Sequence, residues 1–236
     1  MLRVYQIIIF LNLLFIFPCA FAQDSLLNKY GLWVINDIDT YQKTIVNNDD
    51  KRMVDISVVI PGIILDLKYA GADNFMHTAL YPPVQTTYLR KAAAVSLLAV
   101  QAELKKMSLG IKIWDAYRPY SVTEKMWEPV KDDRYAADPK FGSGHNRGIA
   151  VDLTLIDLTT NKELDMGTGF DNFSDTAHWS YTNLPAIILR NRTLLRTVME
   201  KHGFKVLETE CWHFYLPDTK KYELLDLGFE KLDQLQ

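Results

Sequence analysis

Two segments that contain histidine have residue types and spacings that suit a metal ion. In the first, His145 lies on a turn flanked by Gly144 and Gly148 and precedes Asp152, which falls among alternating apolar residues of a predicted strand. An ionised aspartate at such a half-buried position needs a partner, because desolvating a lone carboxylate is costly. A divalent cation would supply that partner, and a capped turn followed by a salt bridge is the alternative.

The second segment places Glu210 and His213 in a Glu-x-x-His spacing. Catalytic zinc needs a neutral imidazole as a ligand and an acid/base carboxylate beside the metal-bound water, and this pair could supply both. A regular strand would point residues three apart to opposite faces, so a bulge or a strand end would have to bring them together. Taken alone, the spacing favours a structural histidine.

The two segments together are more specific than either one. His145, Asp152 and His213 form a set of two nitrogen donors and one oxygen donor, and three protein ligands with a fourth position open for water is the arrangement of catalytic zinc sites. Glu210 is then left as the base. We therefore predict one zinc ion per chain. Cys211 is interpreted as a small buried apolar residue rather than as a further ligand.

The elements that must position these residues are predicted from apolar periodicity. Helices are expected over 89–107 and 189–202, and a Ser-Val-Thr-Glu capping box at 121–124 predicts the start of another. Strands are expected over 58–69, with a break at Pro61-Gly62, and over 111–117, 149–155 and 206–216. Because strands and helices do not alternate in a βαβ rhythm, we predict an α+β fold with an antiparallel sheet flanked by helices.

The first 22 residues have the pattern of a secretory signal peptide. One basic residue, Arg3, precedes an apolar run over 7–17, and Ala-Phe-Ala follows at 20–22. A transmembrane helix needs about 20 apolar residues, whereas Pro18 ends this run, although an uncleaved anchor is the alternative. We predict cleavage near Ala22 and an exported protein, periplasmic or secreted, with no integral membrane segment after cleavage.

The remainder, residues 23–236, is predicted to be a single catalytic domain with 23–55 as a peripheral lead-in. The whole chain is 48% hydrophobic and 23% charged with a net charge of −3, which is typical of a soluble domain. A mildly acidic chain without a basic block is a poor candidate for binding nucleic acid. Loss of Cys19 with the signal peptide leaves Cys211 alone, so no intramolecular disulfide is expected. The sequence does not indicate an oligomeric state.

The order of the motifs resembles a known family. Ser-x-His-x-x-Gly-x-Ala-x-Asp at 143–152 and Glu-x-x-His at 210–213 are similar to the D-Ala-D-Ala dipeptidases, the VanX-like zinc metallopeptidases, which are relatives of the zinc D,D-carboxypeptidases and of the Hedgehog fold. The likeness extends roughly over 65–216. It includes Lys-Tyr-Ala at 68–70, Trp-Asp-Ala-Tyr-Arg-Pro at 114–119 and Met-Gly-Thr-Gly-Phe-Asp at 166–171.

This resemblance implies zinc-dependent hydrolysis of D-alanyl-D-alanine to two D-alanines, with zinc-bound water as the nucleophile. It implies that His145, Asp152 and His213 are the zinc ligands. Glu210 would be the general base, and Arg118 would stabilise the oxyanion of the tetrahedral transition state.

The resemblance also implies a pocket for a small D,D-dipeptide. Ser143, Tyr69 and Asp171 match residues that line this pocket, with Asp171 placed to hold the substrate ammonium. The chain departs from the family at Met76-His77-Thr78, where the family is more glycine-like, and at Cys211, where an aromatic residue is more typical.

Two alternative functions stay open. One is a zinc D,D-carboxypeptidase that acts on cell-wall peptides, and the other is a non-catalytic, zinc-stabilised Hedgehog-like binding domain. Glu210 and Arg118 favour an enzyme, because a binding domain needs neither a general base nor a cation for an oxyanion.

Overall fold

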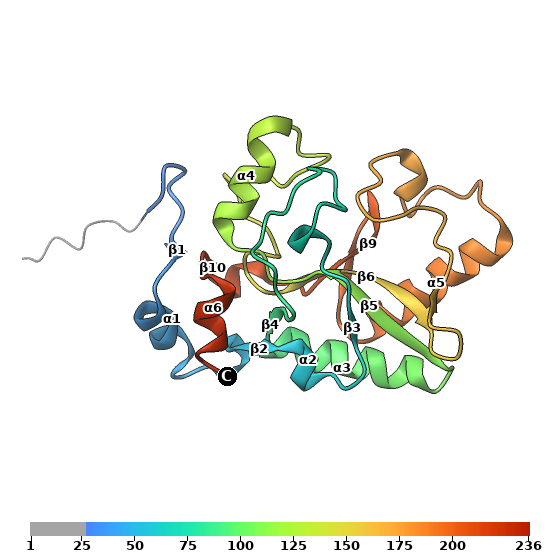
Figure 1. The fold of residues 1–236 in the computed structure, drawn as a ribbon, viewed down its shortest axis with the longest axis horizontal. Helices are drawn as coiled ribbons and strands as arrows, with labels where there is room; N and C mark the ends of the chain where they lie inside the picture. The colour runs from blue at the N-terminus through green and yellow to red at the C-terminus, as the bar shows by residue number, and fades with distance from the viewer. Residues whose placement is uncertain (1–26) are drawn as a thin grey trace, which may run out of the picture.

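The computed structural model describes residues 27–236, which form an α+β fold around a six-stranded sheet (Figure 1). The predicted signal peptide, 1–22, lies outside these residues. The strands are β3 (Ile64–Leu65), β5 (Leu109–Asp115), β6 (Ala150–Asp157), β9 (Glu210–Tyr215) and β8 (Lys205–Leu207), in that order, with β7 (Lys162–Glu163) paired to the end of β6. All pairs are antiparallel except β3 with β5, so the predicted fold class is confirmed with one parallel edge strand.

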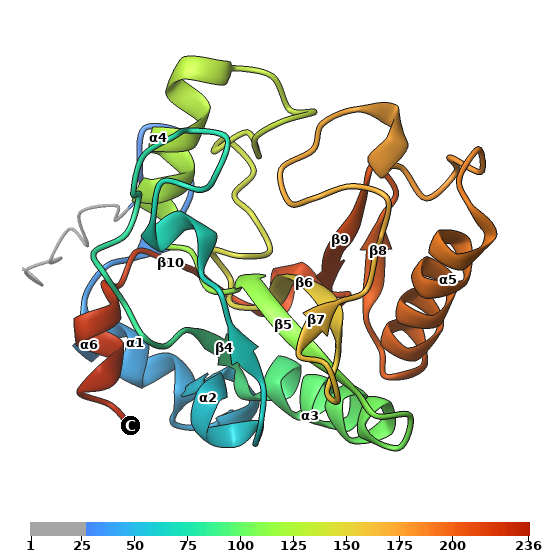
Figure 2. The same cartoon turned by 45° about the vertical axis from the view of Figure 1, so that its right-hand side comes forward.

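Two helices bury one face of this sheet. They are α3 (Lys91–Lys105) and α5 (Ala186–Lys201), which confirm the two helices predicted from periodicity. Figure 2 shows α3 beneath the central strands and α4 (Tyr120–Val130) on the opposite side. The buried residues of α3 that pack on the sheet recur at the predicted spacing: Ala93, Leu97, Val100 and Leu104. This apolar stripe stabilises the sheet because it packs against the apolar side chains of the central strands.

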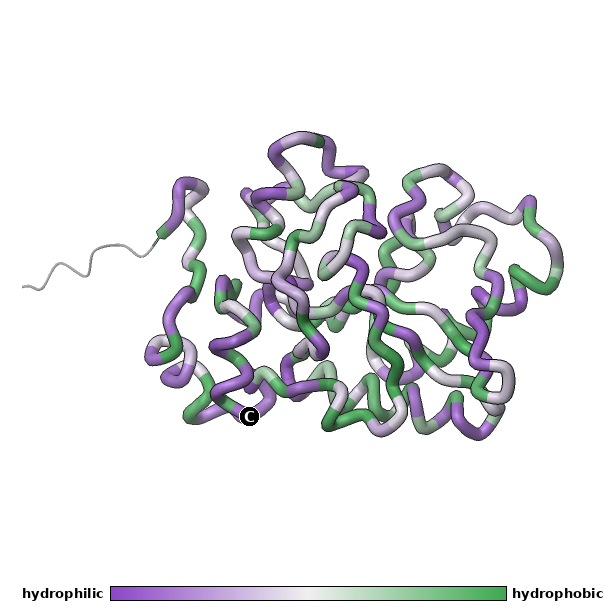
Figure 3. Tube along the Cα trace, in the orientation of Figure 1, coloured by the Kyte–Doolittle hydropathy of each residue, from purple (hydrophilic) through white to green (hydrophobic). Residues whose placement is uncertain are grey.

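Strand β6 explains why the other face is free for polar chemistry. Val151, Leu153 and Leu155 belong to the core cluster that α3 and α5 complete, whereas Asp152 and Thr154 alternate with them along the strand. Because successive side chains of a strand point to opposite faces, Asp152 must lie on the side away from α3. Figure 3 shows the apolar segments concentrated along the central strands.

A second buried cluster joins the beginning and the end of the described chain. Strand β1 (Val34–Ile35) pairs in parallel with β10 (Leu224–Leu225), and β2 (Met53–Asp55) pairs with β4 (Tyr88–Arg90). Helices α1 (Ile38–Ile45) and α6 (Phe229–Asp233) complete this region. Ile35, Tyr41 and Met53 are almost fully buried here, so residues 27–55 are more than the peripheral lead-in that their polar composition predicts.

The strand predicted over 58–69 is only partly correct. Its first part is the short helix α2 (Ile56–Val59), because Asp55 accepts a hydrogen bond from the Ser57 N–H at 2.7 Å and caps the turn. Ile56 and Ile60 are both buried, which is a helical spacing. The strand survives only as β3, which is followed by a 3-10 turn over Lys68–Ala70.

Two further boundaries differ from the prediction. The Ser121 hydroxyl does not cap α4; instead the Asp226 carboxylate accepts from the Ser121 N–H at 2.9 Å, across a long sequence separation. The strand predicted over 206–216 is a hairpin of β8 and β9. Short 3-10 turns complete the structure at Asp49–Lys51, Asp175–Ala177 and Thr219–Lys221. Among residues 27–236, none of the helices has the length and apolar character to cross a bilayer.

Candidate metal centre

The register of three neighbouring strands aligns three chemically active residues. Asp152 of β6 lies opposite His213 of β9 on one side and opposite Asp115 of β5 on the other. A β-bulge between Ile113 and Asp115 shifts the end of β5, so that Asp115 is brought level with Asp152. Cross-strand neighbours point to the same face of a sheet, which places this row on the face away from the core.

His145 reaches the same place from the loop between α4 and β6. Its N–H donates to Ser143 Oγ at 3.1 Å, and the Gly148 N–H closes the turn on the His145 carbonyl oxygen at 3.0 Å. Gly148 has φ of 69°, and a Cβ there would lie 2.7 Å from Met53 Sδ, so only glycine fits the turn. The predicted glycine-flanked turn is therefore confirmed.

Asn146 fixes this loop and was not singled out by the sequence. It is fully buried, its Oδ1 accepts from the Ser143 N–H at 3.0 Å, and its Nδ2 donates to Arg118 O and Thr123 Oγ1, both at 2.9 Å. One side chain thus ties the His145 turn to α4. No local pattern in the sequence marks it, because its partners come from other elements.

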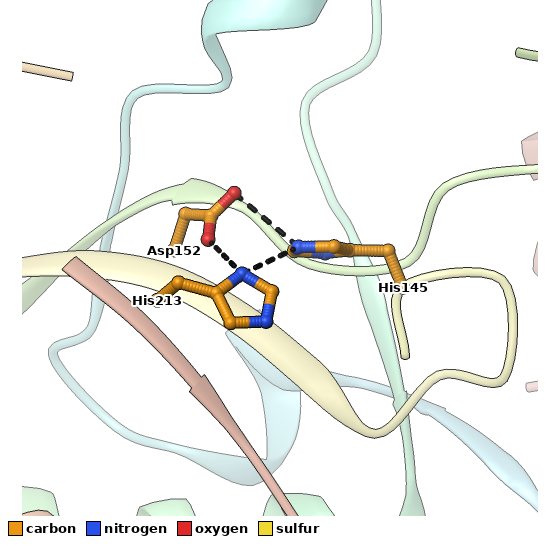
Figure 4. Close-up of side chains that lie close together, drawn as sticks. All are labelled: His145, Asp152 and His213. Carbon is orange, nitrogen blue, oxygen red and sulfur yellow. Dashed lines mark hydrogen bonds and ion pairs between the residues drawn. The ribbon is translucent and has the colours of Figure 1, made fainter. Parts of the chain in front are cut away.

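The three predicted ligand residues converge, and their ligand atoms all lie within 4.8 Å of one another. Figure 4 shows the side chains directed toward a common point. His145 Nε2 lies 3.3 Å from Asp152 Oδ2 and 3.3 Å from His213 Nδ1, and His213 Nδ1 lies 2.9 Å from Asp152 Oδ1. Donors around a tetrahedral zinc ion with bonds of about 2.0 Å would lie about 3.3 Å apart, so the donor set fits this metal.

The backbone selects the nitrogen that His145 presents. His145 Nδ1 lies 2.7 Å from the carbonyl oxygen of Ala116, which can only accept, so Nδ1 carries the proton and donates. Nε2 is then free to act as a ligand. Such a second hydrogen bond orients metal-binding histidines in general. Burial alone would raise the pKa of Asp152, but His145 and His213 outweigh it and lower that pKa, so the carboxylate is ionised.

Glu210 lies beside this centre. Its Oε2 is 3.9 Å from His213 Nδ1, which the regular alternation of a strand would not allow. The ladder between β8 and β9 is irregular here, because Val206 pairs with Phe214 and the next residue, Leu207, pairs with Glu210. The prediction that a bulge or a strand end would bring the two residues together is thus confirmed, because Glu210 is the first residue of β9 and the register is irregular there. Burial raises the pKa of Glu210 to about 7, which suits a group that both accepts and donates a proton near neutral pH.

Arg118 is held rigidly at the edge of the same face. Its Nε and one terminal nitrogen donate to Asp115 Oδ2 at 3.0 and 2.7 Å, and the same nitrogen is 3.9 Å from Asp152 Oδ2. The guanidinium carbon lies 4.9 Å from the centre of the Tyr69 ring, so a cation–π contact supports it from another side. Asp115 belongs to the Trp-Asp-Ala-Tyr-Arg-Pro motif, but sequence reasoning assigned it no function.

Asp171 closes the other side of the site. Its Oδ1 accepts from Tyr69 Oη at 2.9 Å and its Oδ2 accepts from the Phe75 N–H at 3.1 Å. Burial raises the pKa of Asp171 to about 7. The Tyr69 side chain therefore contacts both Arg118, through its ring face, and Asp171, through its hydroxyl.

A cavity of about 370 Å³ brings these groups together. All eight residues predicted for the site line it: Tyr69, Arg118, Ser143, His145, Asp152, Asp171, Glu210 and His213. Sequence reasoning missed Tyr135 and Phe173, which line the same cavity with ring centres 4.9 Å apart. Cys211 lines none of it and is buried, as predicted, with Sγ 3.8 Å from Thr168 Oγ1.

Comparisons with known proteins show to which family the chain is similar. The family model described as D-Ala-D-Ala dipeptidase, Peptidase_M15, matches residues 49–231. A D-alanyl-D-alanine dipeptidase of Escherichia coli K12 is 38% identical over 179 residues, covering 75% of this chain and 91% of that protein. Those of Streptomyces coelicolor and Enterococcus faecalis are 30% and 28% identical, covering 70% and 68% of this chain and 93% and 89% of theirs. Among solved structures, the LdcB LD-carboxypeptidase aligns with a TM-score of 0.43 at 18% identity, covering 80% of this chain and 79% of that one.

Proposed function

Because this chain belongs to the D-Ala-D-Ala dipeptidase family of M15 peptidases, we propose that it hydrolyses D-alanyl-D-alanine to two D-alanines in the cavity described above. One observation carries the proposal: two histidines and an aspartate converge on one point, with Glu210 and Arg118 facing the same cavity. A zinc-stabilised binding domain would need the convergent histidines and aspartate but neither Glu210 nor Arg118.

His145, Asp152 and His213 would hold one zinc ion, for which their donor set is suited. When bound, zinc would act as a Lewis acid on the peptide carbonyl and lower the pKa of a water ligand. The protein contributes the orientation of these ligands. Two of them come from adjacent strands, and the third is fixed by the hydrogen bond from His145 Nδ1 to the Ala116 carbonyl oxygen.

Glu210 is the proposed general base. Its carboxylate accepts the proton of the attacking water and passes that proton to the nitrogen of the leaving D-alanine, so one residue serves both halves of the hydrolysis. Its pKa of about 7, raised by burial, supports this exchange near neutral pH. Glu210 lines the same cavity as the three proposed ligand residues, which supports its role beside the reacting atoms.

Arg118 is the proposed partner of the oxyanion. The negative charge that develops on the carbonyl oxygen requires a cation already in place, because a fixed donor needs no reorganisation during the reaction. The Asp115 carboxylate and the Tyr69 ring hold the guanidinium from two sides. This pre-organisation supports the assignment.

Asp171 and Ser143 are the proposed binding groups for the charged ends of the dipeptide. A free dipeptide carries an ammonium and a carboxylate, so its recognition needs an acidic group and a hydrogen-bond donor. Asp171 supplies the first and the Ser143 hydroxyl supplies the second, and both line the cavity. A carboxylate dedicated to the ammonium would reject peptides whose amine is blocked, which distinguishes a dipeptidase from a D,D-carboxypeptidase.

The proposed activity is tested with residues 23–236 as purified protein. We expect about one zinc ion per chain and release of D-alanine from D-Ala-D-Ala, with little release from an N-acetylated D,D-peptide. Glu210→Gln should retain the metal and lose about 100-fold or more in kcat, the contribution of a general base. Bound zinc without turnover of any D,D-peptide would instead indicate a binding domain, and preference for the blocked peptide would indicate a carboxypeptidase.

We also propose that the protein is exported and acts on its dipeptide substrate outside the cytoplasm. The basic, apolar and Ala-Phe-Ala pattern of residues 1–22 supports this proposal. Cell fractionation followed by mass spectrometry should find a mature protein in the periplasm or medium that begins at Gln23. A chain in the cytoplasm that still contains residues 1–22 would contradict export.

A further inference from the structure

Tyr81 lies behind the site without lining its cavity. It belongs to the irregular segment between the 3-10 turn over Lys68–Ala70 and β4, and its side chain is only 5% exposed. The Tyr81 N–H donates to the Tyr69 carbonyl oxygen at 3.1 Å, which ties the two residues together through the backbone. Tyr81 is absent from the wall of the 370 Å³ cavity and cannot contact a substrate there.

The Tyr81 hydroxyl and the Arg118 guanidinium bind different oxygens of the Asp115 carboxylate. Tyr81 Oη donates to Asp115 Oδ1 at 2.8 Å, while Asp115 Oδ2 accepts both hydrogen bonds from Arg118. Asp115 is 1% exposed, so no bulk water can replace a lost partner. Without the Tyr81 hydroxyl, Oδ1 would be a buried acceptor left unsatisfied, and the carboxylate could rotate away from Arg118 to recover a bond.

The Tyr81 ring supports the second group that holds the guanidinium. The Tyr81 and Tyr69 rings meet edge to face, with centres 6.2 Å apart and an angle of 80°. The face of Tyr69 in turn carries the Arg118 guanidinium. Tyr81 therefore contacts both residues that fix Arg118, one through its hydroxyl and the other through its ring.

We propose that Tyr81 is a positioning residue for Arg118, which it aims at the developing oxyanion through Asp115 and Tyr69. The inference rests on the proposed function, in which Arg118 stabilises the transition state. Transition-state stabilisation depends on donors that are already oriented. Loss of the Tyr81 hydroxyl should therefore reduce kcat and leave KM and metal binding nearly unchanged.

The test compares Tyr81→Phe with Tyr88→Phe in the zinc-loaded enzyme. Both tyrosines are buried outside the cavity wall, and each donates through its hydroxyl to a carboxylate, but the partner of Tyr88 is Asp233 of α6 rather than Asp115. Removal of a direct oxyanion donor costs about 100-fold or more in kcat, so misaiming one should cost less, about 10-fold. We expect that loss in Tyr81→Phe only, with equal zinc content in both variants. Wild-type kcat in Tyr81→Phe would overturn the proposal.

A double-mutant cycle separates positioning from a general structural role. In an Arg118→Ala background, Tyr81→Phe should have no further effect on kcat/KM, because the group that it aims is gone. An equal loss with and without Arg118 would overturn the proposal, since Tyr81 would then act on the site by another route, for example through His145, whose Nδ1 is 3.5 Å from Asp115 Oδ2.

A measurement without metal or substrate keeps this inference distinct from the proposed function. NMR can follow hydrogen exchange of the Arg118 Nε–H in the metal-free protein. This exchange should be about 10-fold faster in Tyr81→Phe than in the wild type or Tyr88→Phe, because the state in which Arg118 has left Asp115 becomes about 10-fold more populated, which corresponds to about 1.4 kcal/mol. If the wild type does not cleave D-Ala-D-Ala, the proposed function fails while this exchange rate still tests Tyr81. An unchanged rate would overturn the positioning role.

Discussion

Asp152 and His213 are direct cross-strand partners on β6 and β9, with Asp152 Oδ1 2.9 Å from His213 Nδ1. Two of the three proposed ligands are thus set by sheet register alone. A slip of one residue would move either side chain to the opposite face, where Leu153 and Phe214 fill the core. The burial of those apolar neighbours therefore holds the metal centre in register.

Removing the charge of Asp152 should weaken metal binding strongly and change the stability of the fold much less. Asp152→Asn keeps the side-chain shape but withdraws the anionic donor. We expect zinc affinity to fall by about 100-fold or more, because loss of a ligand should cost more than the roughly 10–100-fold that loss of a ligand's hydrogen-bond partner costs. Chelator competition measures this affinity. Asp157→Asn, at the partly exposed end of the same strand, is the matched control and should bind zinc normally. Equal zinc affinity in the two variants would refute the ligand role.

Asp171 should give substrate binding a pH dependence near neutrality. Burial raises its pKa to about 7, so the carboxylate is ionised above that pH and neutral below it. Because only the ionised form attracts an ammonium, KM should rise as the pH falls through about 7. Asp171→Asn should raise KM at pH 8 by about 10-fold, the value of one charge-assisted hydrogen bond, and remove this dependence. A KM that is insensitive to this substitution would exclude Asp171 from ammonium binding.

The same residue should also affect stability, with a defined sign. The pKa of Asp171 is higher in the folded protein than its ordinary value of 3.8, so the folded state binds more protons between these limits. Its contribution to the free energy of unfolding is complete below about pH 4 and is lost as the pH rises through about 7. The free energy of unfolding of Asp171→Asn, taken relative to that of the wild type, should therefore be higher at pH 8 than at pH 4. Denaturant titrations at both values measure it, and the opposite trend would be inconsistent with burial of this group.

Gly148→Ala should destabilise the turn that presents His145. A non-glycine residue at φ of 69° costs about 1–2 kcal/mol, and the added Cβ would also approach Met53 Sδ to 2.7 Å. Gly71→Ala is the control, because its φ is −129° and its Cβ would meet nothing closer than 4.0 Å. Chemical denaturation should show the loss only in Gly148→Ala; similar free energies of unfolding in both variants would disprove the conformational argument.

Leu153→Ala should test the core beneath the metal centre. Leu153 is fully buried among the residues that α3 and α5 complete, and truncating such a leucine costs about 2–5 kcal/mol. Leu158, which follows the same strand and is 40% exposed, should lose about 1 kcal/mol or less when changed to alanine. Thermal unfolding compares the two. If Leu158→Ala proved the more harmful change, the assigned face of β6 would be wrong.

Periodic elements and the ligand motifs were predictable from the sequence because their signals are local. The helix α3 and the strand β6 display their apolar faces in the spacing of consecutive residues, and the two segments proposed to bind metal are short. Features that depend on distant partners were not predictable. Asp226 caps α4 from far along the chain, and Tyr81 reaches Asp115 through folding alone.

The residues missed around the site follow the same rule. Asn146 and Asp115 each satisfy several groups from other elements, and neither has a spacing that distinguishes it from an ordinary loop or strand-end residue. Where the sequence misled, at 58–69, β-branched residues favoured a strand while the Asp55 cap and the burial of Ile56 and Ile60 selected a helical turn.

The parallel pairing of β1 with β10 constrains the order in which the molecule can be completed. Val34 is synthesised long before its partner Leu224, and α1 and α6 lie side by side in Figures 1 and 2. The part of the cluster around Ile35 and Tyr41 that Leu225 and Leu227 supply can therefore pack only after the chain has been synthesised beyond those two residues. A variant that lacks residues 224–236 would lose β10 and α6 together, so it would expose the apolar residues that they cover and become a target for proteolysis.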